Sequence, residues 1–462
     1  MSSQTLDKNI NTHSAQIAAV TEGPIFSTLI RLSAPNMLIL VASVLGAIVE
    51  LAYVGNMGTV TLASIAVVFP IIVLQQSFSN GAMGGGVSSA ISRALGAGNE
   101  ARAQEIAVHS LIIGVLAGVL FTVLMLSFAQ PLFHLLGARG QVMEEALAYS
   151  NIVFIGSAAV WLTSMLMSIL RGCGNMKIPS QTLFAVLTLQ AGLGGILGFG
   201  VGSLSGLGIV GIGLGQVIAY AAGVAFLAWY LQTGKSRFSL KFSGITLQKN
   251  IFVEILRVGL MTCISPLQTI LTVLVTTRFI SKFGDNALAG YGIGARLEMV
   301  LIPIAFGIGA ACVPMVGMAI GAGNVHRAKR SAAYGGMLAF AVVGTIGLIV
   351  MVAPHLWANL FSTDLDVLMV ANDYLIWSGP AYAFFGLGLC LLFASQGAQK
   401  VHGPVLAGTV RLIIVSAGCW ILAQFEATPM HFFMLVAAGM TIYGLFAAIS
   451  VYMTNWNPAG NI

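Results

Sequence analysis

The sequence has few charged residues for its length. Lys, Arg, Asp and Glu make up 7% of its 462 residues, whereas hydrophobic residues make up 58%. Because a soluble domain carries about 25% charged residues, this chain could not cover its surface in water. The composition therefore excludes a soluble globular fold. The formal net charge of +6 needs no nucleic acid partner, because multi-span membrane proteins carry extra basic residues in their cytoplasmic loops.

Clustered cysteines are also missing. The five cysteines are scattered, mostly inside apolar runs, and no pair has the spacing of a metal site. No disulfide framework is implied, and we interpret the five as small packing residues. They are Cys173, Cys263, Cys312, Cys390 and Cys419.

Catalytic motifs are absent as well. No nucleophile–base pair, metal motif or phosphate loop stands out, and the glycines within 192–195 lie in an apolar run. We therefore expect neither an enzyme nor a cofactor. The polar segment 1–25 lacks a signal-peptide core and a cleavage site, so we expect the first spanning helix to act as the membrane signal.

Long apolar runs dominate the rest of the chain. Runs of about 20 residues predict membrane-spanning helices, and nothing alternates over the length that a β-barrel needs. The predicted fold is therefore an all-α integral membrane protein with twelve helices. The predicted spans are 28–54, 61–86, 105–127, 146–171, 179–201, 209–232, 252–280, 287–318, 330–353, 368–395, 403–424 and 430–454.

The two halves of the chain share a tetrapeptide. Gly-Ala-Gly-Asn occurs at 96–99 and again at 321–324, and the same spacing separates Pro179 from Pro404. We call this spacing the repeat offset, and positions that it relates are equivalent positions. The pattern predicts a duplicated membrane unit, such as those that form the two lobes of many transporters.

Six spans per half is an even number, so both halves begin and end on the same side of the membrane. We therefore expect a parallel repeat, with two six-helix lobes around a central cleft. The predicted parts are a cytoplasmic N-terminal segment at 1–27, an N-lobe at 28–232, a polar cytoplasmic linker at 233–251, a C-lobe at 252–454 and a short tail at 455–462.

Basic residues predict the orientation, because they favour cytoplasmic loops. They gather in one set of alternate loops, whereas the other set holds most loop acids. We therefore expect a multi-pass plasma (inner) membrane protein with both termini in the cytoplasm, and we expect it to be monomeric. Outside the linker, the basic set is Arg93, Arg102, Arg171, Lys177, Arg327, Lys329, Arg330 and Lys400.

Glu50 is the only charged residue of the apolar stretch 39–54. An ionisable group inside the bilayer is costly, so it usually faces a cavity or a partner. Desolvation disfavours the charged form of a carboxyl, so Glu50 could exchange a proton near neutral pH, or bind sodium when ionised. The alternative is a protonated structural acid that is bonded to a backbone carbonyl.

Arg296 and Glu298 lie within the eighth predicted span. Because they are two positions apart, they point in different directions on a helix. We name both as candidate coupling or cavity partners; the alternative is a structural ion-pair network. Arg278 lies nearer the end of the seventh span and could snorkel to the membrane surface.

Uncharged polar residues also recur inside the spans. Gln76 and Asn80 are four positions apart, hence on one helix face. We name Tyr53, Gln76, Asn80 and Gln268 as candidates for lining a substrate cleft, and Gln190 as a further coupling or cavity partner. The alternative is that these side chains join helices by hydrogen bonds.

These motifs together resemble the multidrug and toxic compound extrusion (MATE) family over nearly the whole chain. The order and spacing of the pieces carry the resemblance. The pieces are Ala34-Pro35 with a later carboxylate, 92–99 (SRALGAGN), 170–175 (LRGCGN) with Pro179, 294–298 (GARLE), 314–317 (PMVG) and 321–324 (GAGN).

The resemblance implies an antiporter that exports amphipathic, often cationic, small molecules by alternating access, driven by protons or sodium. Glu50 stands where the family usually has an aspartate that is tied to cation coupling. Gln190 and Gly194 stand where better-known members have an asparagine and an aspartate. Because a sodium ion needs several oxygen ligands, the missing carboxylates favour proton coupling through Glu50.

Two other functions remain open. A flippase for a lipid-linked oligosaccharide has a similar two-lobed architecture, as the resemblance implies, but its pyrophosphate would need several basic cavity residues. Here only Arg296 and Arg278 are candidates. A channel or receptor is the other alternative, although no repeated selectivity element is visible. The sequence does not indicate the natural substrate.

Overall fold

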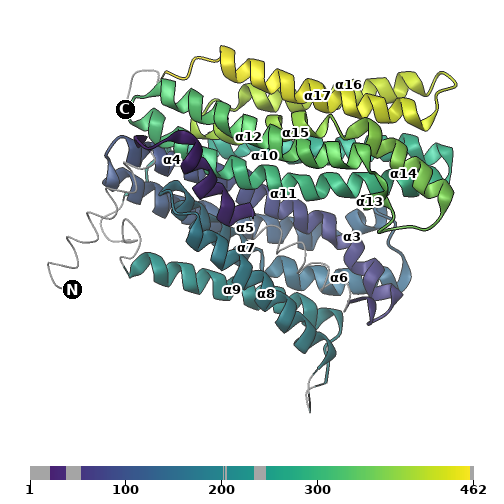
Figure 1. The fold of residues 1–462 in the computed structure, drawn as a ribbon. Helices are drawn as coiled ribbons and strands as arrows, with labels where there is room; N and C mark the ends of the chain where they lie inside the picture. Colours follow the sequence, from purple (N-terminus) through teal and green to yellow (C-terminus); the bar gives the residue numbers. More distant parts are fainter. Residues whose placement is uncertain (1–20, 38–53, 201, 203–204, 234–245, 458–462) are drawn as a thin grey trace. The chain divides into compact units, whose positions relative to one another are not determined.

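The computed structural model describes residues 21–37, 54–200, 202, 205–233 and 246–457, and most of these residues are helical (Figure 1). Among them, nine helices are long and apolar enough to span a membrane, and two bent helix pairs add two more spans if each pair counts as one. The predicted all-α membrane protein is confirmed. Most of the predicted first span, including Glu50 and Tyr53, lies outside the described residues.

The described helices form two compact units. Unit 1 comprises α3 (Thr59–Gln76), the π-helix η1 (Ser77–Met83), α4 (Gly84–Gly96), α5 (Glu100–Leu135), α6 (Gly140–Ile155), α7 (Ser157–Gly172), α8 (Lys177–Phe199), α9 (Ile209–Gln232) and the start of α10 (Lys249–Ile280). Unit 2 comprises the rest of α10, the 3-10 helix η2 (Ser281–Phe283), α11 (Asp285–Gly321), α12 (Val325–Val352), α13 (His355–Ala358), α14 (Leu365–Ser378), α15 (Tyr382–Gly397), α16 (His402–Leu422) and α17 (Pro429–Met453).

Two segments group differently from the predicted lobes. The described residues 21–37 belong to unit 2, although residues 28–37 fall within the predicted N-lobe. Conversely, α10 belongs to unit 1 up to Gly259 and to unit 2 from Leu260 onward. Each half of the sequence therefore begins with a short segment that packs in the opposite unit.

The repeated tetrapeptide forms the same turn in both units. Gly98 and Gly323 both have φ 75°, the left-handed conformation that glycine adopts without strain. The backbone N–H of the following asparagine bonds back to the carbonyl five positions earlier, at 2.9 Å for Asn99 and 2.8 Å for Asn324. This is a Schellman turn, which ends one helix.

The asparagine of the tetrapeptide also begins the next helix. The Asn99 side chain accepts a hydrogen bond from the Arg102 backbone N–H at 2.9 Å, and Asn324 accepts one from Arg327 at 2.9 Å. An N-cap asparagine satisfies a backbone donor that the helix leaves unpaired. The tetrapeptide thus ends one helix and starts the next in each unit, so the repeat offset is a property of the structure as well as of the sequence.

Two predicted spans are broken rather than straight. Helices α6 and α7 meet at a bend of 45°, and α14 and α15 meet at a bend of 58°. At the first bend, Gly156 packs so closely on the Val217 side chain that a Cβ would collide with it. Gly379-Pro380 lies at the second bend, where proline lacks the N–H that helix continuation needs. The predicted spans 146–171 and 368–395 therefore each correspond to a bent pair of helices.

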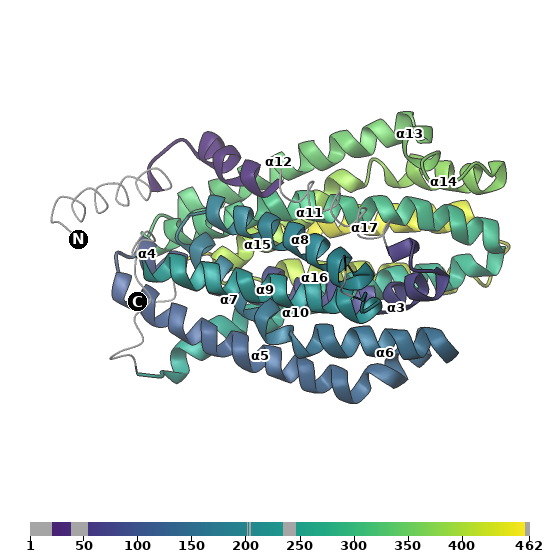
Figure 2. The same ribbon diagram turned by 90° about the horizontal axis from the view of Figure 1, so that it is seen from below.

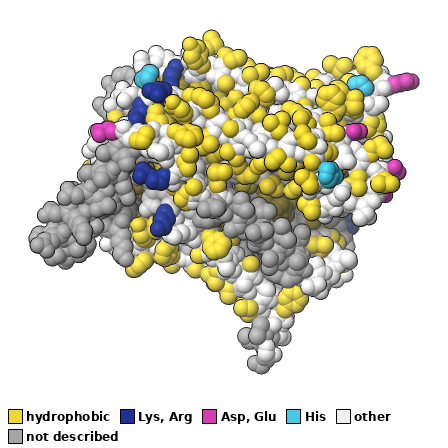
Figure 3. Space-filling view, viewed as in Figure 1, with side chains coloured by type: hydrophobic (Ala, Val, Ile, Leu, Met, Phe, Trp, Pro, Cys, Tyr) yellow, Lys and Arg dark blue, Asp and Glu magenta, His cyan; other side chains and the backbone are white. Residues whose placement is uncertain are grey.

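The surface is that of a membrane protein. On the face in Figure 3, hydrophobic side chains cover most of the area, and Lys and Arg gather toward one end of the helices. On α5, which lies beside α6 in unit 1 (Figure 2), exposed apolar side chains recur at helical spacing: Leu116, Val119, Leu120 and Val123. Such a stripe is suited to lipid contact.

Candidate functional site

Unit 2 contains a buried carboxylate, that of Glu298 on α11. Its side chain is 6% exposed, and the Tyr374 hydroxyl of α14 donates a hydrogen bond to its Oε1. Gly294 lies one helical turn earlier, on the same face of α11. A Cβ on Gly294 would collide with the Tyr374 ring, so this glycine makes room for the tyrosine that reaches Glu298.

Aromatic rings enclose this hydrogen bond. Tyr374 meets Tyr291 edge to face, with ring centroids 5.3 Å apart, and meets Phe433 in the same manner at 5.2 Å. Tyr382 of α15 also lies close enough to interact with Glu298 and Tyr374. Edge-to-face pairs fix ring orientation, so the Tyr374 hydroxyl is held in position by packing.

Arg411 of α16 supplies an opposite charge. The side chain is 4% exposed, and its guanidinium lies over the Phe385 ring, 5.1 Å from the centroid. Its charge acts on Glu298, Tyr291 and Tyr443. Its Nε is buried and has no hydrogen-bond partner within the described part of the chain. We call the group of Glu298, Tyr291, Tyr374, Tyr382 and Arg411 the Glu298 site.

The chemistry of the Glu298 site is that of a buried, compensated acid. With Glu298 ionised, Arg411 balances its charge, and a phenol stabilises it by a hydrogen bond. With Glu298 protonated, Arg411 would be left with an uncompensated charge inside the unit, which is costly. A change in the protonation of Glu298 would therefore change the electrostatics between α11, α14 and α16.

Sequence reasoning overlooked Arg411. It is the only Asp, Glu, Lys or Arg within α16, the same signal that singled out Glu50. Tyr374 could not be inferred, because it is 76 residues from Glu298 and only the fold brings them together.

Unit 1 has a neutral counterpart of Tyr374. Tyr149 is the equivalent position under the repeat offset, and its hydroxyl is 3.5 Å from the Gln216 Oε1. The positions equivalent to Glu298 and Arg411 are Val73 and Val186. The duplicated scaffold thus keeps the tyrosine, while the charged partners are present in unit 2 alone.

The other charged candidates lie apart from Glu298. Arg296 is exposed on another side of α11, with its guanidinium 5.3 Å from the Phe361 ring centroid. The predicted divergence of Arg296 and Glu298 is thus what the structure shows. Arg278 is exposed in the last turn of α10.

Gln268 joins two helices. Its Nε2 donates to the Thr409 Oγ1 at 2.7 Å and to the Val405 carbonyl at 3.3 Å, so it links α10 to α16. This is the alternative of a hydrogen-bond connector rather than a cleft-lining side chain.

The polar candidates of unit 1 lie on and near the π-helix. Gln76 is exposed, and its Nε2 donates to the Tyr220 hydroxyl at 3.4 Å. Asn80, inside η1, accepts a hydrogen bond from Arg171 of α7. Arg171 itself is buried in the last turn of α7. Gln190 is half-buried on α8.

The chain is similar to known proteins over most of its length. A family model described as MatE matches residues 35–196 and 262–421, more than half of the chain. The chain is 27% identical to "Probable multidrug resistance protein YoeA" of Bacillus subtilis, over 90% of this chain and 89% of the relative. It is 24% identical to "Multidrug export protein MepA" of Staphylococcus aureus, over 95% and 96%.

Another relative has a different name. The chain is 26% identical to a protein of Shewanella oneidensis named "FAD transporter", over 84% of this chain and 85% of the relative.

Solved structures share the fold. A transporter of the MOP superfamily from Pyrococcus furiosus has a TM-score of 0.87 at 22% identity, covering 94% of this chain and 97% of that one. A multidrug resistance MATE transporter in an outward-facing conformation has a TM-score of 0.83 at 23% identity, covering 94% and 95%.

Proposed function

The chain belongs to the MATE family of membrane transporters, and on this premise we propose that it exports amphipathic, cationic small molecules in exchange for protons. Its fold is the twelve-helix, two-lobe MATE fold, and members of the family are transporters rather than enzymes. The observation that carries the proposal is that relatives named for multidrug resistance or export align with 90% and 95% of the chain. Both repeated halves therefore take part in the similarity.

The proposed coupling residue is Glu50, the lone carboxylate of the first span. Protonation of Glu50 from outside would favour substrate release, and deprotonation toward the cytoplasm would restore attraction for a cation. Such a local charge change shifts the population of two conformations. The Glu298 site offers a second group with suitable chemistry, because its carboxylate is buried and hydrogen-bonded by Tyr374.

Transport in reconstituted vesicles tests the proposal. A cationic dye should move against its gradient when a pH gradient is imposed and should not respond to a sodium gradient alone. Glu50→Gln should abolish the response to the pH gradient, whereas Glu426→Gln, an exposed loop acid, should leave it unchanged. Transport that follows only the sodium gradient, or a wild-type rate in Glu50→Gln, would contradict proton coupling through Glu50.

A second candidate is export of an anionic, pyrophosphate-bearing amphiphile, a class that includes lipid-linked oligosaccharides. Two observations favour it: one relative is named a FAD transporter, and Arg411 has a buried Nε without a hydrogen-bond partner among the described residues. Phosphate recognition uses guanidinium donors. FAD efflux from the same vesicles, lost in Arg411→Gln while dye efflux persists, would support this candidate.

We also propose the plasma membrane as the location, with both termini in the cytoplasm. The gathering of basic side chains toward one end of the helices supports this orientation (Figure 3). Cysteines introduced at each terminus should be modified by an impermeant maleimide only after the cells are opened.

A further inference from the structure

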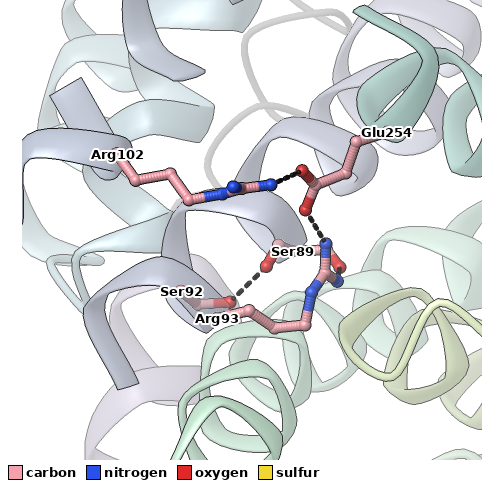
Figure 4. Close-up of polar contacts among 5 residues, drawn as sticks. All are labelled: Ser89, Ser92, Arg93, Arg102 and Glu254. Carbon is pink, nitrogen blue, oxygen red and sulfur yellow. Dashed lines mark hydrogen bonds and ion pairs between the residues drawn. The ribbon is translucent and has the colours of Figure 1, made fainter. Parts of the chain in front are cut away.

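Helix α10 starts in a network of charges within unit 1. Glu254 accepts a hydrogen bond from the Arg93 Nη2 at its Oε1 and from the Arg102 Nη2 at its Oε2, both at 2.8 Å (Figure 4). Within the described ranges these are the direct ion pairs. Arg93 comes from α4 and also bonds to the Ser89 Oγ at 2.5 Å. One carboxylate therefore ties α4, α5 and α10 together.

The Glu254 carboxylate is less exposed to solvent than an ordinary surface acid, and so is its partner Arg93. The side chains of Arg93 and Glu254 are 14% and 19% exposed, whereas that of Arg102 is 48% exposed. An exposed ion pair contributes little, but charge-assisted hydrogen bonds to both carboxylate oxygens are shorter and stronger than neutral ones. The pair with Arg93 should therefore carry most of the attachment.

A histidine holds the residue before α10. His109 is fully buried on α5; its Nδ1 is 2.7 Å from the Glu105 carbonyl, and its Nε2 accepts the Gln248 backbone N–H at 2.9 Å. The imidazole is therefore neutral, with its proton on Nδ1. The Phe252 ring packs edge to face on it at 4.7 Å.

The backbone of α10 then lies directly against α4. A Cβ on Gly86 would lie 2.8 Å from the Ile255 carbonyl oxygen, so only glycine permits this approach. Gly259 in turn faces Met83 at the end of η1 so closely that a Cβ would collide with its sulfur. Small residues allow such backbone contact between membrane helices. We call Arg93, Arg102, His109 and Glu254, with these glycine contacts, the α10 anchor.

The duplication provides an independent observation. Arg327 is the equivalent of Arg102, since both are capped by the repeated asparagine. In unit 2, its Nη2 donates to the Gly23 carbonyl at 2.6 Å. Gly23 lies in the described segment 21–37 of the first half, and Glu254 lies at the start of α10 in the second half. The two equivalent arginines thus each hold the entry segment that packs in their own unit.

The two attachments use different groups. In unit 1 a carboxylate binds two arginines, whereas in unit 2 Arg327 binds a backbone carbonyl beside Glu22; the equivalent of Arg93 is Met318. Helix α10 continues into unit 2 beyond Gly259. A conformational change in unit 1 that moves the start of α10 can therefore be transmitted along this one helix.

We propose that Arg93, Arg102 and Glu254 are positioning residues for transport. They keep the start of α10 fixed to unit 1 through the whole cycle, so that a change of state in unit 1 reaches the part of α10 that belongs to unit 2. The inference rests on the alternating-access function proposed above. It assigns these residues an effect on turnover and none on substrate binding.

The first test is Glu254→Gln, which keeps the shape and removes the charge. The maximal rate of dye efflux should fall about tenfold while KM changes less than about twofold, the signature of a lost conformational step. Glu254→Asp should recover part of the rate. Glu144→Gln, an exposed acid of unit 1, should match the wild type. A wild-type maximal rate in Glu254→Gln would overturn the proposal.

A second test does not depend on that variant folding. Cysteines replace Arg102 and Glu254 in a chain whose five native cysteines have been substituted. A short bis-methanethiosulfonate reagent can then cross-link the two new cysteines. Before cross-linking, this variant lacks the ion pairs of the anchor and should transport slowly, as Glu254→Gln does. If the anchor stays closed through the cycle, cross-linking should raise its dye efflux. Cross-linking that abolishes the remaining efflux, with recovery after a reductant is added, would show that the anchor opens during the cycle, and the proposal would be wrong. Absent efflux in the wild-type chain would instead count against the proposed function.

Discussion

At the scale of single residues, the Glu298 site depends on Gly294, because a glycine has no side chain and leaves room for the Tyr374 ring. Gly294→Ala should push the Tyr374 ring away from Glu298, because the new methyl group would collide with that ring. Efflux and thermal stability should both fall. Gly292→Ala is the matched control on the same helix, since a Cβ there meets nothing within 4 Å. Equal melting temperatures for the two variants would contradict the described packing.

The Tyr374 hydroxyl itself should also matter. Tyr374→Phe removes the donor to Glu298 and should cost about 1–3 kcal/mol, because a buried acceptor loses its hydrogen-bond partner. Thermal unfolding in detergent, followed by tryptophan fluorescence, measures the loss. Tyr452→Phe, at a position that is 83% exposed, should have no effect; a similar shift in both variants would argue against the bond.

The sequence revealed part of the Glu298 site and missed the rest for physical reasons. Glu298 stood out because a charge in an apolar span is costly. Arg411 carries the same signal within α16 and could have been found. The tyrosines gave no signal, because a phenol is ordinary in a membrane helix and only the fold places Tyr374 beside Glu298. Glu50 lies outside the described residues, and its coupling role stays a prediction.

At the scale of helices, the repeated asparagines should contribute equally. Asn99→Ala and Asn324→Ala each remove a side-chain cap, and each should cost about 1 kcal/mol. The double variant should lose the sum, because the caps share no partner. Glycine at either position should cost only a few tenths of a kcal/mol. Chemical denaturation of the five variants checks this; a large difference between the two alanine single variants would refute the equivalence.

A second repeated turn offers a reciprocal exchange. Gly174 has φ 81°, and its equivalent position in the second half is Gln399, with φ 56°. Gly174→Gln should cost about 1–2 kcal/mol, because side chains are strained in this region. Gln399→Gly should gain up to about 1 kcal/mol, since relief of strain outweighs the greater freedom of glycine in the unfolded chain. Melting temperatures that move in the same direction would contradict this reasoning.

Helix boundaries were predicted better than helix breaks. The apolar runs located the spans because desolvation of the backbone leaves few alternatives to a helix in lipid. The bend between α14 and α15 had a visible signal in Gly379-Pro380, which the apolar length of 368–395 concealed. The bend at Gly156 had none, because it depends on contact with Val217 from a distant helix.

At the scale of the whole molecule, the exchanged segments predict how the chain can be divided. A break between residues 240 and 241 leaves each half with one segment that packs in the unit of the other half. The halves should therefore copurify and transport when produced together, and each alone should be sensitive to protease. Moving the break to follow Gly259 interrupts α10 and should abolish assembly. Stable, protease-resistant single halves would contradict the exchange.

The placement of residues 21–37 has a consequence for synthesis. The Gly23 carbonyl meets its arginine 304 residues later in the chain, so this segment leaves the ribosome long before its partner on α12 has been made. Unit 1 likewise stays incomplete until Glu254 has been made. A membrane chaperone that protects helices before their partners are made should stay bound longest to this N-terminal segment. Slowing translation after residue 259 should lengthen the time for which this segment lacks its partner, and should not affect the completion of unit 1.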